Sequence, residues 1–414
     1  MSILRVLVIN NGIWPSGAQI STNEFIELLK NYAEIKILTC QQEKYLIKIS
    51  ASVHRLPCRN IGVLLIMHPD HIIKNFVKWA DIIWIATGEF EMPQRIKQIK
   101  NIPIVAHLHS YEFLCPFMTL LYASKEVCKD HCTVLKSIEC KLKSDAYLTL
   151  LGASRFPHRL IMSAGSTIIW TPLYYLRWKK IITNSFNNID GFIAISKTLR
   201  DLHIQYFPRF KEKPFETIYN LAIEPLKYVK PDPREPYSNY VLYASGSNPD
   251  KGPHLLLEAW PTISKEFKDL KLYIVGCKNS WVERMAKKMN LKNIIFFERL
   301  PSDEYYNIMY RARVAVMPSI WPEPFGRIPV EANRLGVPAV VSSAGGLPET
   351  IVDGVTGYIF KAGDVYDLAE KIMKVLEKDF DREDIIKHSY EKINPQREVE
   401  KLVNFFESVI SREG

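Results

Sequence analysis

The segment IWPEPFGRIPVE, from Ile320 to Glu331, contains two glutamates, three prolines and one glycine. The apolar run VAVMPS at residues 314–319 precedes it and predicts a strand. A helix is predicted to begin near Pro329, because proline suits the first helical turn, where its missing N–H is not needed. The helix is predicted to end near Leu335, with Gly336 as its C-cap. The segment therefore lies where a strand passes into a helix, at the carboxyl end of that strand.

The predicted start of this helix suits an anionic ligand. Backbone N–H groups are free at the start of a helix and the helix dipole is positive there, so a diphosphate is a fitting occupant. Gly326 lets the backbone approach such a ligand closely. Glu331 offers two acceptors to a pair of hydroxyls, such as a ribose diol, and Glu323 can reach a further part of the same ligand. The spacing alone equally allows a structural role, with Glu331 favouring the helix dipole and Glu323 as a loop acid.

The rest of the chain repeats the passage from strand to helix. In the first half, ILRVLVIN, IKILTC, ADIIWIAT, IPIVAHLHS and DGFIAIS alternate with helical patterns. A second series starts after residue 238 and includes NYVLYAS, KLYIVG, NIIFFE and PAVVSS. This rhythm predicts parallel βαβ units, and hence two doubly wound α/β domains. The proline-rich segment 224–238 is predicted to link them, and the two domains are expected to face each other across a ligand cleft.

Composition and charge narrow the class of protein. The 414 residues allow two or three domains, and 47% hydrophobic with 24% charged residues is typical of a globular protein with a large core. The formal net charge of +9 suits a nucleic acid, an anionic membrane or a phosphorylated ligand equally. The N-terminal apolar run is short and carries Arg5, so it is interpreted as a strand and not as a secretory signal. No run reaches the roughly 20 clean apolar residues of a membrane-spanning helix.

The stretch from Pro318 to Phe360 resembles the signature of the retaining glycosyltransferases of family 4, which have the GT-B fold. That family carries a Glu-x7-Glu pair, then a strand, a G-G-x-x-E turn and a D-G-x-T-G turn, and all of these occur here in order. SGAQISTNEFIELL, LHSYEFLCP, NPDKGPHLLLEAW and EKLVNFFESVI resemble further landmarks, so the resemblance covers nearly the whole chain. It implies two Rossmann-like domains. Residues 1–222 plus 395–414 would form an N-terminal acceptor-binding domain, and residues 223–394 a C-terminal nucleotide-sugar-binding domain.

The resemblance implies a retaining hexosyltransferase. It would move a sugar from a nucleotide-diphosphate sugar to a hydroxyl of a saccharide or lipid-linked acceptor. Because lysine and helix dipoles stabilise the leaving diphosphate, neither a metal nor a cofactor is required. The alternatives are two other GT-B enzymes, a sugar phosphorylase and a nucleotide-sugar epimerase. A nucleic-acid-binding protein is disfavoured, because its basic residues would gather with aromatic residues on one face, whereas here they are mostly dispersed.

The resemblance also implies roles for individual residues. His109 would hydrogen-bond a hydroxyl of the donor sugar, Lys251 would stabilise the leaving diphosphate, and Glu323 would bind hydroxyls of the donor sugar. These three residues form the predicted catalytic set, and each has a structural alternative: a core histidine, a solvated lysine in a turn and a loop acid. The predicted donor-binding residues are Gly17, Gly246, Lys251, Phe325, Gly326, Arg327, Glu331, Gly346 and Glu349.

The chain departs from the family pattern at three positions. Many members carry an arginine five residues before the lysine, where this chain has Gly246. Arg327, or the backbone amides of Gly246 and Ser247, would then supply the missing positive charge. Ala18 replaces the second of two adjacent glycines, and Ser110 replaces an aspartate after the histidine.

Four of the seven cysteines fall within 26 residues: Cys115, Cys128, Cys132 and Cys140. Three interpretations remain open, namely a structural four-thiolate zinc site, unlinked thiols and disulfides. His131 is a candidate replacement ligand for the zinc site.

Residues 155–180 combine basic flanks with an apolar and aromatic centre. Arg155 and Arg159 lie on one side, while Arg177, Lys179 and Lys180 lie on the other. This pattern is typical of a membrane interface, and a helical hairpin that covers the acceptor site is the alternative. The protein is therefore expected in the cytoplasm, with peripheral contact to the cytoplasmic membrane face through residues 155–180 and with no nucleic-acid partner.

Overall fold

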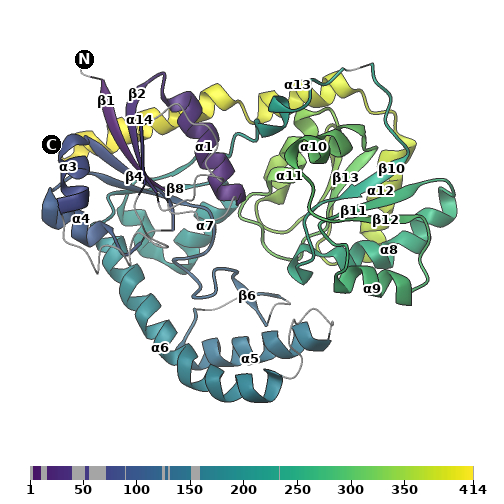
Figure 1. Cartoon of the computed structure of the whole chain (residues 1–414), viewed down its shortest axis with the longest axis horizontal. Helices are drawn as coiled ribbons and strands as arrows, with labels where there is room; N and C mark the ends of the chain where they lie inside the picture. Colours follow the sequence, from purple (N-terminus) through teal and green to yellow (C-terminus); the bar gives the residue numbers. More distant parts are fainter. Residues whose placement is uncertain are drawn as a thin grey trace. The chain divides into compact units, whose positions relative to one another are not determined.

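The computed structural model describes residues 3–10, 16–39, 52–55, 71–88, 90–123, 126–128, 131–150, 159–232 and 234–413. The chain divides into two compact units, each built around one parallel sheet (Figure 1). Unit 1 comprises Met1–Met118, Leu173–Leu221 and Pro395–Gly414, and unit 2 comprises Thr119–Pro172 and Ala222–Asn394. The predicted fold class of two doubly wound α/β domains is confirmed.

Unit 1 has a seven-stranded sheet in the order β3-β2-β1-β4-β5-β8-β9. Its central strands are buried along most of their length, as in a sheet with helices on both faces. The strands are β1 (Leu4–Asn10), β2 (Ala33–Thr39), β3 (Ser52–Arg55), β4 (Ile82–Thr87), β5 (Ile104–Leu108), β8 (Gly191–Ala194) and β9 (Phe215–Thr217). The helices are α1 (Gly17–Leu29), α3 (His71–Trp79), α4 (Pro93–Ile99), α7 (Lys197–Tyr206), the 3₁₀ helix η2 (Pro208–Glu212) and α14 (Pro395–Glu413).

Helix α14 belongs to unit 1, although it follows the whole of unit 2 in sequence. Its apolar face is buried, and the Phe406 ring lies 6.0 Å from the ring of Trp84 on β4. Gly191 on β8 leaves room for α14, because a Cβ there would press against Val409 and Phe405. At the start of α14, the buried carboxylate of Glu398 accepts a hydrogen bond from the backbone N–H of Tyr219 at 3.0 Å.

Unit 2 has a six-stranded sheet in the order β12-β11-β10-β13-β14-β15. The strands are β10 (Tyr240–Tyr243), β11 (Lys271–Val275), β12 (Ile294–Phe297), β13 (Val314–Met317), β14 (Ala339–Ser342) and β15 (Gly357–Phe360). The helices are α8 (Pro253–Glu266), α9 (Trp281–Lys288), α10 (Ser302–Arg311), α11 (Arg327–Arg334), α12 (Val365–Glu377) and α13 (Arg382–Lys392), with the 3₁₀ helices η3 (Glu224–Lys227), η4 (Pro249–Lys251) and η5 (Leu347–Thr350).

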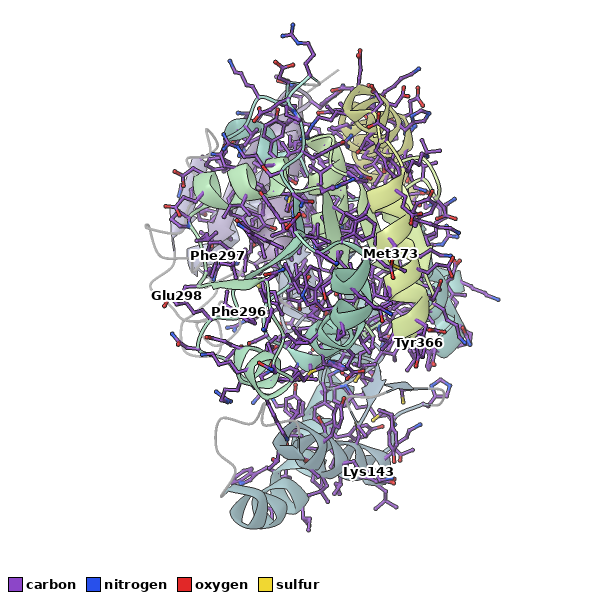
Figure 2. All side chains as sticks on the ribbon, turned by 90° about the vertical axis from the view of Figure 1, so that its right-hand side faces the viewer. Lys143, Phe296, Phe297, Glu298, Tyr366 and Met373 are labelled. Atoms are coloured by element: carbon purple, nitrogen blue, oxygen red, sulfur yellow. The ribbon has the colours of Figure 1, made fainter. Side chains whose placement is uncertain are left out.

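The two faces of this sheet carry different helices. Side chains alternate along β10, so Val241 and Tyr243 join the core cluster of α8, α9 and α12, whereas Tyr240 and Leu242 join the cluster of α10 and α11. Figure 2 labels Tyr366 and Met373 on α12, together with Phe296 and Phe297 on the edge strand β12.

The segment between β5 and β8 contributes to both units. The two-stranded hairpin β6 (Leu121–Tyr122) and β7 (Glu126–Val127) and helix α5 (Val134–Leu150) lie in unit 2. Helix α6 (Arg159–Asn188) crosses the division between the units at Pro172. The predicted domain limits of 1–222 plus 395–414 and 223–394 stay a prediction, and unit 1 leaves out residues 119–172.

The predicted linker 224–238 packs onto unit 2. Val229 is buried beside Tyr306 of α10, and the backbone of Asp232 hydrogen-bonds the Tyr310 hydroxyl. The prolines make this segment irregular without making it separate, because its apolar and aromatic side chains find partners on α10.

Candidate functional site

The predicted site residues of unit 2 follow neighbouring strands at one edge of the sheet. The strand order reverses between β10 and β13, and open parallel sheets bind ligands at the carboxyl ends of the strands at such a reversal. Gly246 and Lys251 follow β10, whereas Glu323 and Gly326 follow β13. The turn of residues 345–349 follows β14. Topology alone therefore brings these three loops to one edge.

The loops after β10 and β13 are held together by backbone contacts. The carbonyl of Asp250 accepts hydrogen bonds from the N–H groups of Ile320 (2.9 Å) and Trp321 (3.1 Å) and from the hydroxyl of Ser319 (3.0 Å). Gly252 has φ +70°, and a Cβ there would collide with the carbonyl of Pro318. A glycine is therefore required where the two loops meet.

Lys251 and Glu323 form an ion pair at this junction. Lys251 Nζ lies 2.5 Å from Glu323 Oε1, and the side chains are 18% and 6% exposed. The ammonium also lies 4.0 Å from the ring centroid of Trp321. Burial raises the pKa of the Glu323 carboxyl, and the Lys251 charge opposes that rise. An ammonium group donates up to three hydrogen bonds, so Lys251 retains donors for an anionic ligand.

Helix α11 begins with the residues of the quoted segment. Its N-cap is Gly326, with φ +92°, and a Cβ there would collide with the side chain of Leu347. The helix starts at Arg327, two residues earlier than predicted. Pro329 then occupies the third helical position, where its missing N–H would also have had no partner within the helix. At the other end Gly336 has φ +70°, its N–H bonds the Asn333 carbonyl and the N–H of Val337 bonds the Ala332 carbonyl, which is a Schellman motif.

Arg327 and Glu331 form a second buried ion pair on the first turn of α11. Arg327 Nε donates to Glu331 Oε1 at 3.0 Å, and the side chains are 9% and 6% exposed. The cation suggested as the substitute for the missing arginine is therefore paired with the acid assigned to the ribose. Phe325, also a predicted donor-binding residue, is buried.

The turn after β14 positions the backbone of Glu323. The N–H of Gly346 donates to the Glu323 carbonyl at 2.6 Å, and Glu323 forms a β-bridge with Gly345. Gly345 has φ +63°, and a Cβ there would collide with Glu323 and Pro322. Gly346 has the ordinary φ of −82°. The steric need for glycine therefore falls on Gly345 and not on the predicted Gly346. Glu349 lies on η5 in the same turn.

The loop after β10 is fixed by two aromatic residues. The Tyr243 hydroxyl donates to the Gly246 carbonyl and the indole N–H of Trp281 donates to the Ser247 carbonyl, both at 2.7 Å. Two buried side-chain oxygens nearby, Ser245 Oγ and Asp250 Oδ1, have no hydrogen-bond partner among the described residues. Sequence reasoning missed both of them, although they lie within six residues of Lys251 in the sequence.

His109 and Gly17 belong to unit 1. His109 directly follows β5, and its ring centroid lies 4.4 Å from that of His107, whose pKa burial lowers well below its usual value. Gly17 is the first residue of α1, behind Ser16, whose side chain forms a capping box with Gln19. His109 thus follows the carboxyl end of β5, and Gly17 follows the carboxyl end of β1 in the sequence. The structure thus gathers the remaining predicted residues in unit 2.

The four clustered cysteines divide between the units, with Cys115 in unit 1 and the other three in unit 2. Cys115, Cys128, Cys132 and Cys140 are thiols outside any disulfide, and the Cys140 thiol donates to the Leu121 carbonyl at 3.5 Å. Among the described residues, no group of three or more His, Cys, Asp or Glu is arranged to hold a metal ion. The zinc interpretation stays a prediction.

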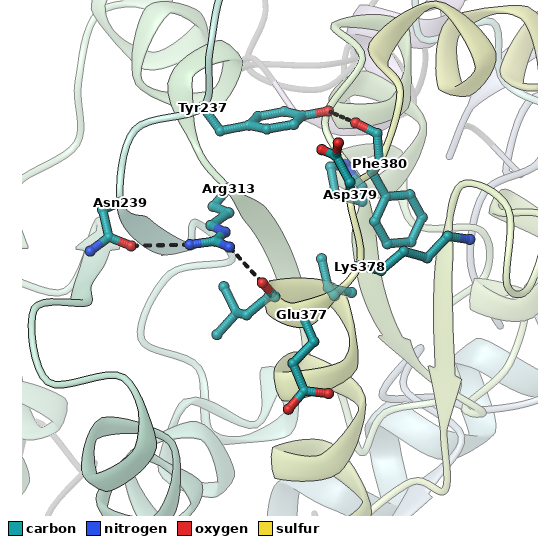
Figure 3. A pocket seen from close by; sticks show the side chains of 10 residues that line it. Tyr237, Asn239, Arg313, Glu377, Lys378, Asp379 and Phe380 are labelled. Carbon is teal, nitrogen blue, oxygen red and sulfur yellow. Dashed lines mark hydrogen bonds between the residues drawn. The ribbon is translucent and has the colours of Figure 1, made fainter.

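A cavity of about 500 Å³ opens at the amino edge of the unit 2 sheet (Figure 3). It is lined by Asn239, Arg313 and Pro338, which precede β10, β13 and β14, and by the end of α12. Arg313 donates to the Asn239 side chain and to the Leu376 carbonyl. None of the predicted site residues lines this cavity.

Comparison with known proteins defines the fold first. The structure is similar to that of Anabaena Alr3699/HepE in complex with UDP-glucose, with a TM-score of 0.67 at 17% identity over 98% of this chain and 100% of that chain. It is also similar to sucrose-phosphate synthase from Thermosynechococcus elongatus, with a TM-score of 0.62 at 16% identity over 99% of this chain and 100% of that chain. At such identities the likeness concerns the fold alone, and that fold is GT-B.

Residues 229–392 match the family model of Glycosyl transferases group 1. The chain is 30% identical over 183 residues to spore coat protein SA of Bacillus subtilis (strain 168), which is 40% of this chain and 48% of that protein. It is 28% identical over 223 residues to the uncharacterized glycosyltransferase MJ1178 of Methanocaldococcus jannaschii, which is 53% of this chain and 58% of that protein. The chain thus spans about half the length of the curated relatives that it matches. Assignment to family 4 stays a prediction.

Proposed function

We propose that this protein is a glycosyltransferase that uses a nucleotide-diphosphate sugar as donor. The observation that carries the proposal is the Lys251–Glu323 ion pair, which lies at the strand-order reversal of unit 2 beside the N-terminus of α11. The group 1 match over residues 229–392 supports it, as does the fold shared with a protein whose complex holds UDP-glucose.

Each site residue has a part in this proposal. Lys251 and the positive end of the α11 dipole stabilise the charge that grows on the leaving diphosphate. Glu323 binds hydroxyls of the donor sugar, and Glu331 binds the ribose diol. Arg327 orients Glu331 through their ion pair and lies close enough to α11's N-terminus to add positive charge there. No step calls on a metal or a cofactor.

The reaction is proposed to retain the configuration of the sugar. The bond between C1 and the diphosphate oxygen breaks, and a bond from the acceptor hydroxyl to C1 forms on the same face. The proton of that hydroxyl passes to the leaving diphosphate, so no protonated carboxylic acid is needed as it is in glycoside hydrolases. His109 hydrogen-bonds the donor sugar from unit 1, as the family resemblance implies.

The acceptor is proposed to be a saccharide or a lipid-linked hydroxyl, reached at the cytoplasmic face of a membrane. On α6, Ile169, Leu173 and Leu176 are 61%, 55% and 57% exposed, at a spacing that puts them on one helix face. Lys179 and Lys180 follow, and the sequence of α6 contains no acidic residue. Among the described residues, no helix is long and apolar enough to cross a membrane. Such a helix is suited to lie in an anionic interface.

Vesicle binding tests the membrane contact. The protein should sediment with vesicles that contain phosphatidylglycerol at low salt and remain in the supernatant with pure phosphatidylcholine. A Leu173→Gln, Leu176→Gln double variant should lose this binding, whereas Tyr366→Ser, which changes an exposed residue of α12, should keep it. Equal binding by both variants would exclude the exposed face of α6 as the contact.

A panel of nucleotide sugars tests the main proposal. Binding is measured for each donor by calorimetry, and turnover is followed with and without a hydroxyl acceptor, with the anomeric configuration of the product read by NMR. We expect one donor to support acceptor-dependent transfer with retention. Release of sugar 1-phosphate with inorganic phosphate would instead identify a phosphorylase, and a changed nucleotide sugar without acceptor would identify an epimerase.

A further inference from the structure

Trp321 contacts two parts of unit 2 that are far apart in sequence. On one side, its ring lies 4.0 Å from the Lys251 ammonium. On the other, its indole N–H donates to the carbonyl of Thr119 at 2.6 Å, across 202 positions of sequence. Its own backbone is fixed by the hydrogen bond to the Asp250 carbonyl. A single side chain therefore joins the segment Thr119–Ala123 to the lysine of the site.

The segment Thr119–Ala123 needs such support. Leu120 and Ala123 both have φ +54°, a left-handed conformation that is unfavourable for a residue other than glycine. Other anchors include the Leu120 carbonyl, which accepts from the N–H of Cys128, the pairing of β6 with β7, and Cys140, which hydrogen-bonds the backbone of Ala123. A strained backbone persists only where its surroundings hold it, and Trp321 supplies a contact from the site itself.

Trp321 also restricts where the Lys251 ammonium can point. The negative face of the indole attracts the cation, and Glu323 takes one of its hydrogens. The ring and the carboxylate thus contact the ammonium group at the same time. A long lysine side chain with several rotatable bonds loses much of its freedom in this arrangement before any ligand arrives.

We infer that Trp321 is a positioning residue of the donor site, which orients Lys251 and holds the segment Thr119–Ala123 as one wall of that site. This inference rests on the proposed function for the identity of the ligand. The link between Trp321 and the segment does not depend on it. The alternative is a purely structural tryptophan, which would contribute to stability alone.

Two substitutions separate the two contacts of Trp321. Trp321→Phe keeps an aromatic face for Lys251 and removes the hydrogen bond to Thr119, whereas Trp321→Leu removes both. The matched control is Trp260→Phe, since Trp260 is a core residue of the same unit whose indole N–H donates to the Lys292 carbonyl at 3.0 Å. A structural effect alone should appear in the control as well.

Hydrogen exchange and NMR give readouts in the ligand-free protein. In Trp321→Phe and Trp321→Leu, amide exchange in peptides that span residues 119–123 should rise about fivefold, the factor expected for one lost hydrogen bond. The ε-CH₂ signal of Lys251 should be shifted by the ring current in the wild type and in Trp321→Phe, and should return to the position of a solvated lysine in Trp321→Leu. Trp260→Phe should change neither. Unchanged exchange in Trp321→Phe, or an unchanged Lys251 signal in Trp321→Leu, would overturn the inference.

Binding of UDP connects these readouts to the site. Calorimetry should show affinity reduced by about tenfold in Trp321→Leu and by less than about threefold in Trp321→Phe. UDP affinity equal to wild type in Trp321→Leu would overturn the role in orienting Lys251. If the wild type binds no nucleoside diphosphate at all, the proposed function fails, and the exchange and NMR results decide the inference by themselves.

Discussion

The carboxyl edges of the two sheets have the same strand layout but carry different kinds of side chain. In each sheet the first three strands of the unit lie in reverse order of sequence, and the later strands follow in sequence order. The strand order therefore reverses beside the unit's first strand, which is β1 in unit 1 and β10 in unit 2. In unit 2 that edge carries two buried ion pairs, Lys251–Glu323 and Arg327–Glu331. In unit 1 the corresponding edge carries the adjacent rings of His107 and His109, beside a hydrogen bond from Thr87 to Asn10 at 2.9 Å.

This difference shows what topology decides and what side chains decide. Strand order determines where a ligand can bind, whereas the charge at the edge determines which ligand is stabilised there. Burying charged pairs costs desolvation free energy, so a folding requirement alone does not explain two of them at one edge. We call the edge of unit 2 with the two ion pairs the charged edge, and the edge of unit 1 with His107 and His109 the histidine edge. We interpret the charged edge as suited to the diphosphate of the donor, and the histidine edge as suited to sugar hydroxyls.

The largest effect is expected from removing the cation of the charged edge. Lys251→Ala should lower kcat for transfer by about a hundredfold to a thousandfold, because a preorganised charge opposite the leaving diphosphate is lost. Steady-state kinetics with a saturating donor measures this. The exposed Lys288→Ala on α9 is the matched control and should retain wild-type activity. A loss of less than tenfold in Lys251→Ala would remove the main distinction between the two edges.

Glu323→Gln should separate transfer from diphosphate binding. Transfer should fall by about a hundredfold, because the contact to the donor sugar is weakened in the transition state. UDP affinity should be retained or increase by about threefold, because a neutral amide oxygen holds the Lys251 ammonium less strongly than the carboxylate does. Kinetics and calorimetry on the same preparation test both parts. A loss of UDP affinity as large as that in Lys251→Ala would show that Glu323 mainly holds the lysine in place.

The His109→Ala variant tests the role of the histidine edge of unit 1. We expect kcat to fall by about tenfold to a hundredfold with UDP affinity unchanged, because this residue is assigned to the sugar and not to the diphosphate. His388→Ala on α13 serves as the control. Weaker UDP binding in His109→Ala would mean that unit 1 also recognises the nucleotide, and the comparison of the edges would then need revision.

Glu331→Ala should weaken donor binding by about tenfold, the factor for charge-assisted hydrogen bonds to a diol. The same factor should separate UDP from 2′-deoxy-UDP in the wild type and vanish in the variant. Glu304→Ala, at an exposed position of α10, should leave both affinities unchanged. If the variant still discriminates against the deoxy nucleotide, the ribose assignment is wrong.

The smallest effect concerns stability at mildly acidic pH. Burial lowers the pKa of His203 in unit 1 from the ordinary value of about 6.5 to about 4, so the folded state resists protonation. The contribution of the neutral His203 ring to the free energy of unfolding is fully present above pH 6.5 and is lost as the pH falls toward 4. Between pH 7.5 and 6 the free energy of unfolding should fall by about 0.8 kcal/mol. Urea unfolding at the two pH values measures it. His203→Phe keeps a ring beside Phe210 and should show a smaller change with pH. An unaltered pH dependence would assign the effect to other groups.

The fold and most residues of the charged edge could be predicted from the sequence. Glycine, proline and apolar periodicity determine the local backbone conformation, so their effect can be inferred from short stretches of sequence. Gly326 and Gly336 both have positive φ, at the two ends of the helix predicted between them. Contacts between distant segments escaped it. Gly345 is required by the backbone of Glu323, and Trp321 reaches Thr119, and neither partner can be inferred from local spacing.

One local contact was also misassigned. The Arg327–Glu331 pair lies at a helical i, i+4 spacing, so the sequence contained that contact although it was assigned as two separate ligand contacts. Closeness in sequence does not by itself decide the fate of the cysteine cluster, since Cys115 belongs to a different unit from the other three.

The position of α14 has a consequence for biosynthesis. A ribosome completes the whole of unit 2 before it makes Pro395–Glu413, yet Phe406 and Val409 lie in the core of unit 1. Until α14 emerges, Gly191 and Trp84 face no partner from that helix, and the apolar surface that it covers stays open to water or to chaperones. Unit 1 is thus begun first on the ribosome and finished last, with unit 2 free to fold in the interval.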